Sequence, residues 1–407
     1  MERMELEEAR ELALDAVTPI RETRQVPLEE ALGLVTAEAI YAPIDSVPFD
    51  CSPLDGFALR SEDSRSATAE HPVRLKVVGA VYAGMVFDRA IQKGETVRIM
   101  TGAAMPENAD CMVPKEAVQD EGTALLLSQP LGHHENYVFR GEDIKKGQLL
   151  IAPGQGLEFS HLGILAAMGY GSVSVLRPPN IGLLCTGNEL SPPDTPLLPG
   201  KIYNSNEVLL GSRLRELRFT PQILSAMGDD GTAVAEKIAS SMTALDILLT
   251  TGAVSVGDKD IMHEVLALLG AKRLFWRLNC KPGGSVLCAF HKGKLLVCLP
   301  GYPFAAVTML ELLVRPVLAK LTGRTGLQLK RRRAILKNPF PKDSIGKRRL
   351  LRARLEYSET DPLPSVYLPA GHGSSQIFSL PGCNCLVDIP VGSGALTQGS
   401  IVEVIML

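Results

Sequence analysis

The stretch ALDILLTTG, residues 244–252, decides the fold. It is a nearly continuous apolar run that ends in small residues, and DIMHEVLALLG, residues 260–270, follows it with apolar side chains at helical spacing. A short apolar run of this kind is typical of a strand that is buried on both faces of a sheet. A buried strand followed by a helix is the repeating element of parallel sheets.

The same order of strand and helix occurs three more times around this stretch. The pairs are IGLLCTG (181–187) with NEVLLGSRLRELR (206–218), TPQILSAMGDD (220–230) with GTAVAEKIASSM (231–242), and KLLVCLPG (294–301) with PFAAVTMLELLVRPVLAKL (303–321). The pattern predicts an α/β multidomain protein whose central domain, residues 177–326, is a doubly wound, mostly parallel sheet with helices on both faces.

The flanking segments have a different texture. Residues 47–137 carry short alternating runs such as VRLKVVGAVYAG, broken by Gly and Pro, which predict an inserted small β domain. Residues 1–46 and 138–176 carry predicted helices, at 4–17 and near 160–168, and form a helical connecting region. Strands such as RRLLRARLEY in residues 327–407 predict a small C-terminal β barrel or sandwich.

Charge and composition narrow the class of protein. The 407 residues carry a formal net charge of −3, which gives no overall attraction to nucleic acid or to anionic membranes. The basic runs KRRR (330–333) and KRR (347–349) alternate with apolar residues and lack interleaved aromatics, which favours a solvated or ligand-facing strand over nucleic-acid contact.

Location is predicted from the same kind of argument. The N-terminus lacks the basic start and apolar stretch of a secretory signal, so a cytoplasmic protein is expected. The longest apolar stretch, 304–318, contains Glu311, Arg315 and Pro316, so no transmembrane segment is expected. The eight cysteines are scattered and are expected to be buried free thiols.

The loops after the predicted strands are the expected place for a site, because ligands of open α/β sheets bind beyond the carboxyl ends of the strands. Glycines there admit a ligand, but the carboxylates of Asp258 and Asp260 would repel an anion. The carboxylates of Glu189, Asp229 and Asp258 are suitable ligands for a divalent cation. Mg²⁺ held by these carboxylates would resolve the conflict. Acids of this kind also cap helices, and both interpretations stand for any single residue.

Two further motifs bear on function. Neither the Walker A motif nor the dinucleotide fingerprint follows a strand, which speaks against ordinary NTPases and dehydrogenases. The segment GHGSSQ, residues 371–376, either cradles an oxyanion with Ser374 and Ser375 or simply turns the chain.

Eight motifs, read in order, resemble the MoeA family of molybdopterin molybdenumtransferases, to which the E domain of gephyrin belongs. They are SPLDGFAL (52–59), RIMTGAAMPENADCMVPKE (98–116), RGEDIKKGQLL (140–150), CTGNEL (185–190), GKIYNSN (200–206), TTGAVSVGDKD (250–260), KPGGSV (281–286) and LPGYPFA (299–305). The resemblance implies an elongated homodimer with four domains per subunit and an active site between subunits. It also implies insertion of molybdenum from molybdate into adenylated molybdopterin, with release of AMP and assistance from Mg²⁺.

The resemblance assigns roles to residues of this chain. Catalytic roles fall on Asp258, Asp55, Glu189 and Asp143, and the metal ligands are expected among Glu189, Asp229 and Asp258. Substrate-binding roles fall on Thr101, Asp229, Thr251, Ser255, Lys281, Pro300, Pro303, Ser374 and Ser375. The expected partners are the two small-molecule substrates, a second copy of the chain and other cofactor-synthesis proteins, with no nucleic acid and no membrane.

The chain departs from the family at five positions. It has Gly284 where a second lysine is common, Glu207 for Arg, Tyr302 for Asn, Ala253 for Gly and Thr251 for Ser. The first two remove about two positive charges, and each lost contact to a charged group costs roughly 1.5–3 kcal/mol. Compensation is expected from Lys259, Lys292 or the arginines of the C-terminal segment; without it, the alternative is a catalytically impaired paralogue that binds pterin or a partner protein.

Overall fold

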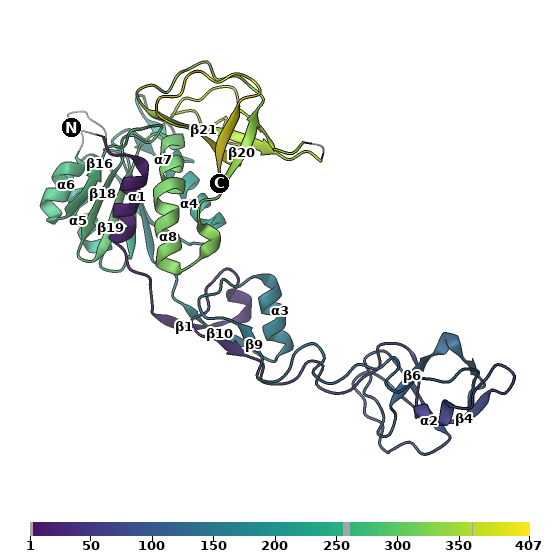
Figure 1. Ribbon diagram of the computed structural model, residues 1–407. Coiled ribbons are helices and arrows are strands. Elements are labelled where there is room, and N and C mark those ends of the chain that lie inside the picture. The colour runs from purple at the N-terminus through teal and green to yellow at the C-terminus, as the bar shows by residue number, and fades with distance from the viewer. Residues whose placement is uncertain (1–2, 255–260, 360) are drawn as a thin grey trace.

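The protein is elongated, with three bodies in a row (Figure 1). The computed structural model describes residues 3–254, 261–359 and 361–407. An α/β layer carrying a β barrel forms one end, a small connecting body lies in the middle, and a β domain forms the other end. Ser255 and Asp258 lie outside the described residues, as does Lys259.

The α/β layer is built on a six-stranded sheet in the order β14-β11-β15-β19-β18-β16. Its parallel strands are β14 (Gln222–Met227), β11 (Ile181–Thr186), β15 (Ile247–Thr251) and β19 (Lys294–Leu299). The antiparallel strands β18 (Leu287–His291) and β16 (Lys272–Trp276) extend one edge. The predicted doubly wound, mostly parallel sheet is therefore confirmed, with β16 and β18 as strands that the sequence analysis did not identify.

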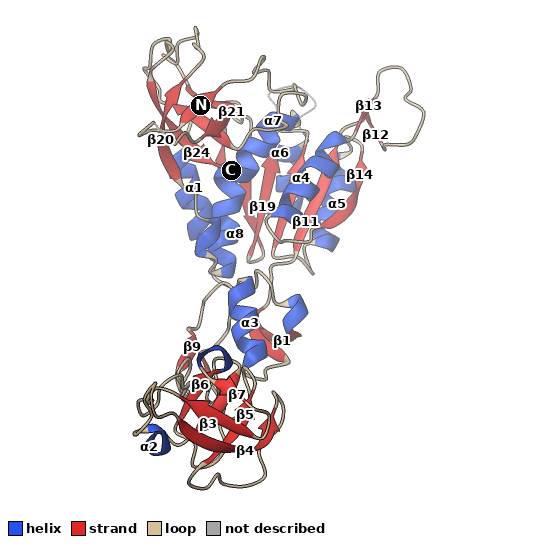
Figure 2. Cartoon of the chain, turned by 90° about the vertical axis from the view of Figure 1, so that its right-hand side faces the viewer, coloured by secondary structure: helices blue, strands red, loops and turns tan. Residues whose placement is uncertain are grey.

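Both faces of the sheet are covered by helices (Figure 2). One face packs against α1 (Leu6–Asp15), α4 (Ser205–Glu216), α7 (Pro303–Met309) and α8 (Arg315–Thr322), and the other against α5 (Gly231–Ser241) and α6 (Met262–Leu269). Successive residues of β15 alternate between these cores, with Leu249 in the first and Leu248 in the second. Burial on both sides is why the strand is apolar at every position from 247 to 249.

Helix α1 belongs to the packing of the α/β layer. Its buried side chains Leu6, Ala9 and Ala13 join the core that contains α8 and the sheet, although the sequence analysis grouped residues 1–46 with the connecting region. The chain reaches the connecting body only after this helix (Figure 1).

A buried ionic cluster lies where α7 continues into α8 through a five-residue π-helical segment, Leu310–Val314. The Glu311 side chain there is 0% exposed and accepts hydrogen bonds from Arg213 Nε at 2.5 Å and from the Arg315 guanidinium at 2.9 Å. The charges that interrupt the longest apolar stretch are therefore paired with each other and with α4. No helix in the described part of the chain is long and apolar enough to cross a membrane.

The connecting body and the β domain are small. The connecting body pairs β1 (Thr23–Pro27) with β10 (Ser172–Leu176) and β2 (Ile40–Tyr41) with β9 (Leu149–Ile151), beside α3 (Phe159–Ala167). The β domain is a six-stranded mixed sheet in the order β6-β3-β5-β4-β8-β7. Its elements are β3 (Gly56–Leu59), α2 (Ser61–Ser64), β4 (Val73–Val81), β5 (Glu95–Ile99), β6 (Cys111–Pro114), β7 (Gln119–Asp120) and β8 (Ala124–Leu127).

The C-terminal segment folds into a closed barrel. Strands β21 (Arg348–Glu356), β22 (Ser365–Tyr367), β20 (Arg331–Leu336), β24 (Ile401–Met406) and β23 (Cys385–Ile389) pair in that order, and β23 pairs back to β21. A short strand of the α/β layer, β17 (Cys280–Lys281), pairs in parallel with the start of β21. This pairing attaches the barrel to the α/β layer. We propose the predicted domain boundaries for these bodies, with α1 assigned to the α/β domain because of its packing.

An ion-pair network ties the barrel to α1. The Arg348 guanidinium contacts Asp388 of the barrel at 2.5 Å and Glu7 of α1 at 2.7 Å, and Arg331 also contacts Asp388 at 2.8 Å. Burial by itself raises the pKa of Asp388, but the hydrogen bonds and charges of Arg348 and Arg331 outweigh it and hold that pKa below its ordinary value of 3.8.

The network predicts an acid-dependent loss of stability. Because the pKa of Asp388 is lowered on folding, its contribution is complete above 3.8 and is lost as the pH falls through the lower pKa of the folded state. We expect the difference in unfolding free energy between the wild type and Asp388→Asn to shrink as the pH is lowered from neutral toward about pH 2. Urea unfolding at a series of pH values measures this difference. A difference that stays constant over the whole range would contradict the ion-pair assignment.

Candidate functional site

Two adjoining cavities open at the carboxyl edge of the parallel strands, against the barrel. One has a volume of about 490 Å³ and is walled by the loops after β11, β15 and β19 together with residues 280–285. The other has a volume of about 700 Å³ and is walled largely by barrel residues 338–342, 349–351 and 368–375. Lys281, Pro282, Tyr302 and Ser374 line both cavities. We call the two cavities together the cleft.

The floor of the cleft depends on a close approach between two strand ends. Gly252 has φ +94°, and a Cβ atom there would lie 2.1 Å from the carbonyl oxygen of Thr186. Only glycine fits this position without a shift of the backbone. The end of β11 and the start of the loop after β15 are therefore in direct backbone contact beneath the cleft.

Ala253, which follows, also has a left-handed backbone, with φ +51°. A side chain in this region costs roughly 1–2 kcal/mol relative to right-handed backbone, partly offset by the larger entropy that glycine loses on folding. We expect Ala253→Gly to raise the free energy of unfolding by about 0.5–1 kcal/mol. Ala239→Gly, at an exposed position of α5, is the control and should lower it by about 1 kcal/mol. Equal losses in the two variants would contradict the strain at Ala253.

The carboxylates of the loops have different surroundings. Glu189 is exposed and lines the first cavity; its carbonyl accepts the Ile202 N–H at 2.8 Å, whereas its carboxylate has no hydrogen-bond or ion-pair partner among the described residues. Asp229 Oδ2 accepts the Asn188 N–H at 3.3 Å, while Asn188 Oδ1 accepts the Asp229 N–H at 3.2 Å, which fastens the loop after β14 to the loop after β11. Asp230 accepts the Ala233 N–H at 2.9 Å and caps α5. The capping interpretation thus applies to Asp230 and not to Glu189 or Asp229.

A complete metal centre is not formed by the described residues alone. Within residues 3–254, 261–359 and 361–407, no group of three or more His, Cys, Asp or Glu side chains could hold a metal ion. Glu189 is an available oxygen ligand on the cavity wall. The third expected ligand, Asp258, lies outside the described residues.

Thr251 lies beneath the cleft. Its side chain is buried, its hydroxyl accepts a hydrogen bond from Asn206 Nδ2 at 3.4 Å, and its carbonyl accepts one from Thr186 Oγ1 at 3.1 Å. Asn206 Nδ2 also donates to the Gly301 carbonyl at 2.7 Å. The structure therefore makes Thr251 a support of the floor, and it adds Asn206 as a link between α4, β15 and the loop after β19.

Positive charge gathers in the cleft because of the pairing between β17 and β21. That pairing sets Lys281 beside Arg349. Lys347 lines the first cavity, and Lys342 and Arg349 line the second. Burial, followed by the charges of Arg3 and Lys281, lowers the pKa of Lys347. Glu189 is the one carboxylate among the described lining residues, so the cleft attracts anions.

The expected sources of positive charge in place of a lysine at Gly284 have different positions in the structure. A Cβ atom at Gly284 would lie 2.8 Å from the Cys280 carbonyl oxygen, so this turn has no room for a side chain without a backbone shift. Lys292 lies in the turn before β19, at the opposite end of that strand from the cleft, and its predicted compensating role is therefore wrong. Arg349, one of the expected arginines of the C-terminal segment, lines the cleft together with Lys342 and Lys347.

Glu207 has a local role. Asn204 caps α4 by accepting the Glu207 N–H at 3.4 Å, and Asn204 Nδ2 donates to the Glu207 carboxylate at 3.0 Å. The carboxylate that replaces the family's arginine is therefore engaged at the first turn of α4.

The barrel loop 371–376 is shaped by a buried arginine. Arg352 is fully buried and donates to the carbonyls of Gly371, Gly373 and Gln376 at 3.0 to 3.2 Å. Its guanidinium lies 4.2 Å from the ring centroid of Phe304 in α7, and the Phe304 N–H donates to the Ser374 carbonyl at 3.1 Å. The loop both turns the chain and lines the second cavity with Ser374 and Ser375.

The two prolines of the loop after β19 have different positions. Pro300 lines the first cavity, and Pro303 is the first residue of α7. The proline ring suits this first helical position, which needs no backbone N–H.

Three predicted residues lie far from the cleft within one chain. Asp55 Oδ1 accepts the Thr101 N–H at 2.9 Å and the Thr101 hydroxyl at 2.8 Å, in the β domain. These hydrogen bonds, the backbone one first, hold the pKa of Asp55 below its ordinary value. Asp143 lies in the segment that returns from the β domain, where Ser46 Oγ donates to it at 3.5 Å. The β domain occupies the opposite end of the molecule from the α/β layer and the barrel (Figure 1), whose residues line the cleft.

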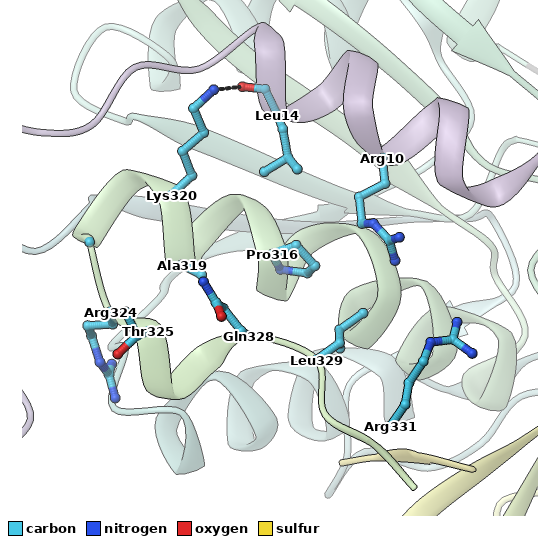
Figure 3. A pocket seen from close by; sticks show the side chains of 11 residues that line it. Arg10, Leu14, Pro316, Ala319, Lys320, Arg324, Thr325, Gln328, Leu329 and Arg331 are labelled. Atoms are coloured by element: carbon cyan, nitrogen blue, oxygen red, sulfur yellow. Dashed lines mark hydrogen bonds between the residues drawn. The ribbon is translucent and has the colours of Figure 1, made fainter. Parts of the chain in front are cut away.

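A further cavity of about 530 Å³ lies between α1 and α8, away from the cleft (Figure 3). Lys320 Nζ donates to the Leu14 carbonyl at 2.8 Å, and Arg324 donates to the Leu217 carbonyl at 2.8 Å. These cations therefore satisfy carbonyls at the ends of α1 and α4. None of the predicted site residues is among the described residues that line this cavity.

Comparison with known proteins covers nearly the whole chain. Residues 4–169 match the MoeA N-terminal region (domains I and II), 182–320 a probable molybdopterin binding domain, and 333–407 the MoeA C-terminal region (domain IV). The chain is 32% identical over 382 residues to the molybdopterin molybdenumtransferase of Staphylococcus epidermidis (strain ATCC 35984), covering 94% of this chain and 90% of that protein. The enzyme of the same name from Staphylococcus aureus (strain Mu50) gives the same identity and coverage.

Solved structures give the same relation. The molybdopterin biosynthesis MoeA protein of Pyrococcus horikosii superposes with a TM-score of 0.82 at 32% identity, covering 100% of this chain and 99% of that one. A molybdenum cofactor biosynthesis protein of Pyrococcus furiosus superposes with a TM-score of 0.60 at 19% identity, which supports the fold alone.

Proposed function

Because this chain belongs to the MoeA family, we propose that it is a molybdopterin molybdenumtransferase that inserts molybdenum from molybdate into adenylated molybdopterin and releases AMP. The observation that carries the proposal is the cleft at the carboxyl edge of the sheet. Four cations line it against a single described carboxylate, and glycine-containing loops form its floor. Both substrates are anionic, and the cleft has the charge to hold them.

Different residues of the cleft can bind different groups of the substrates. Lys281 belongs to both cavities, so its ammonium can hold an anionic oxygen at their junction. Arg349 presents a guanidinium, whose fork geometry suits oxyanions, on the barrel side. Ser374 and Ser375 add hydroxyl donors from a loop that Arg352 holds in place.

Mg²⁺ fits the donor chemistry of the loops. Glu189, whose carboxylate lies on the cavity wall and has no partner among the residues that the structure describes, is the described residue that would hold it, with Asp229 nearby on the adjoining loop and Asp258 as the third carboxylate. When bound, Mg²⁺ would polarise the phosphoanhydride of the adenylated substrate. Asp258 is our first choice as metal ligand or as acid–base group.

A homodimer would reconcile the two groups of predicted residues. Asp55, Thr101 and Asp143 lie in and beside the β domain, whereas the cleft is lined by the α/β layer and the barrel at the other end of the molecule. The β domain of a second copy would bring its carboxylates to the cleft. Sedimentation of the full chain tests this step, and a monomer that is fully active would contradict it.

The test of the proposed function uses the full chain with adenylated molybdopterin, molybdate and Mg²⁺. We expect AMP release and formation of molybdenum cofactor, with both reduced in Asp258→Ala and in Glu189→Gln. Equal background rates in the wild type and in Asp258→Ala would sink the proposal. The alternative, a paralogue that binds pterin without efficient transfer, predicts binding with no AMP release in this same assay.

A further inference from the structure

Tyr302 is an exposed aromatic residue at the junction of the two cavities, and we propose that its ring stacks on a planar heteroaromatic ring of the bound ligand. The inference rests on the proposed function, because adenylated molybdopterin offers two such rings, adenine and pterin. Each of these rings is linked to phosphate. The ligand class is therefore a planar heteroaromatic phosphate ester.

Tyr302 lies where a ligand that occupies both cavities would contact it. Tyr302 is 63% exposed and lines both the cavity of about 490 Å³ and the cavity of about 700 Å³. A ligand that extends from one cavity into the other passes the tyrosine ring. A ring this exposed contributes little to the core, so its removal should leave the fold intact.

The backbone beneath the ring is fixed. Tyr302 precedes Pro303 and has φ −72° and ψ 129°, the extended conformation that a following proline favours. The Gly301 carbonyl accepts from Asn206 Nδ2 at 2.7 Å, and the Tyr302 carbonyl accepts from the Ala306 N–H at 2.9 Å. The backbone that carries the ring is therefore already ordered, so no conformational entropy is lost there when the ligand binds.

Residues that line the same cavities as Tyr302 can bind the phosphate of the ligand. Lys281 and Ser374 line the same two cavities, so an ammonium and a hydroxyl are available for a phosphate. The asparagine that the family often has at this position offers an amide in place of a ring. Stacking is thus specific to this chain. We expect it to increase the affinity for the ligand by on the order of tenfold.

The experiment measures binding to the full chain by calorimetry, without molybdate. The probes are AMP, a pterin monophosphate and ribose 5-phosphate, which has no heteroaromatic ring. We expect Tyr302→Ala to weaken binding of AMP or of the pterin monophosphate about tenfold, and Tyr302→Phe to bind like the wild type. Ribose 5-phosphate should bind equally to all variants. The probe whose affinity falls identifies which ring lies on Tyr302.

Tyr357→Ala is the matched control, because Tyr357 is 73% exposed and is not among the described residues that line the cleft. Unchanged affinity of Tyr302→Ala for both ring-bearing probes overturns the inference, as does failure of both probes to bind the wild type. An equal loss in Tyr302→Phe also overturns it, because the hydroxyl would then be the contact. Ring-dependent binding in a protein that fails the transfer assay would sink the proposed function and leave the stacking intact.

Discussion

Replacing Glu311 with alanine is expected to lower the free energy of unfolding by about 3–5 kcal/mol. The Glu311 carboxylate is fully buried and contacts both Arg213 and Arg315, whose side chains are 23% and 9% exposed. Its removal leaves two arginines in a largely dry environment with fewer partners. Burial of an unpaired charge is far more costly than loss of a surface ion pair.

The chain offers both a probe and a control for this variant. Trp276, the single tryptophan, lies on β16 of the same α/β layer, so its fluorescence follows unfolding of that layer in urea. Glu216 also contacts Arg213, at 2.8 Å, but its side chain is 67% exposed. Glu216→Ala should cost about 0–1 kcal/mol. Overlapping urea transitions for the two variants would show that the buried network is not the source of stability.

Replacing Lys281 with glutamine is expected to lower kcat/KM for molybdenum transfer by about 10-fold to 100-fold. Lys281 lines both cavities, so its charge acts where they meet. A lost hydrogen bond to a charged group costs roughly 1.5–3 kcal/mol, which corresponds to that range of rates. The measurement is AMP release as a function of molybdate and of adenylated molybdopterin.

Lys292→Gln is the control for charge alone. Lys292 is an exposed lysine in the turn at the other end of β19, so its loss should leave kcat/KM unchanged. The kcat/KM of Lys347→Gln should fall between those of the other two variants, because Lys347 lines the first cavity and is not among the described residues that line the second. If Lys281→Gln and Lys292→Gln behaved alike, Lys281 would have no specific role in the cleft.

The sequence predicts most of the fold because the decisive signals are local. The run at residues 244–252 is apolar at successive positions, and the structure has a strand there that is covered on both faces. The family suggested by eight motifs is confirmed by matches over nearly the whole chain. Strands β16 and β18 were not identified because neither is followed by a helix, and the repeat of strand and helix is what identified the other strands of the sheet.

The site was predicted less completely because much of it is formed by distant contacts. Lys347 and Arg349 reach the cleft only through the pairing of β21 with β17, which no local pattern reveals. Thr251 is the last residue of β15 rather than part of the loop after it, and its packing against the end of β11 buries it. The charge lost at Gly284 was visible in the sequence, whereas its replacement depends on tertiary structure.

The β domain leaves and rejoins the rest of the chain through neighbouring segments. Isolated antiparallel bridges pair Ser46 with Ile144 and Cys51 with Val138, so the outgoing and returning segments run side by side. A short turn that joined Cys51 to Val138 in place of the β domain would leave the connecting body and the α/β layer continuous in the chain. The β domain is therefore a modular insertion, and a shortened chain that lacks it could be built to separate what the cleft does alone from what the arm contributes.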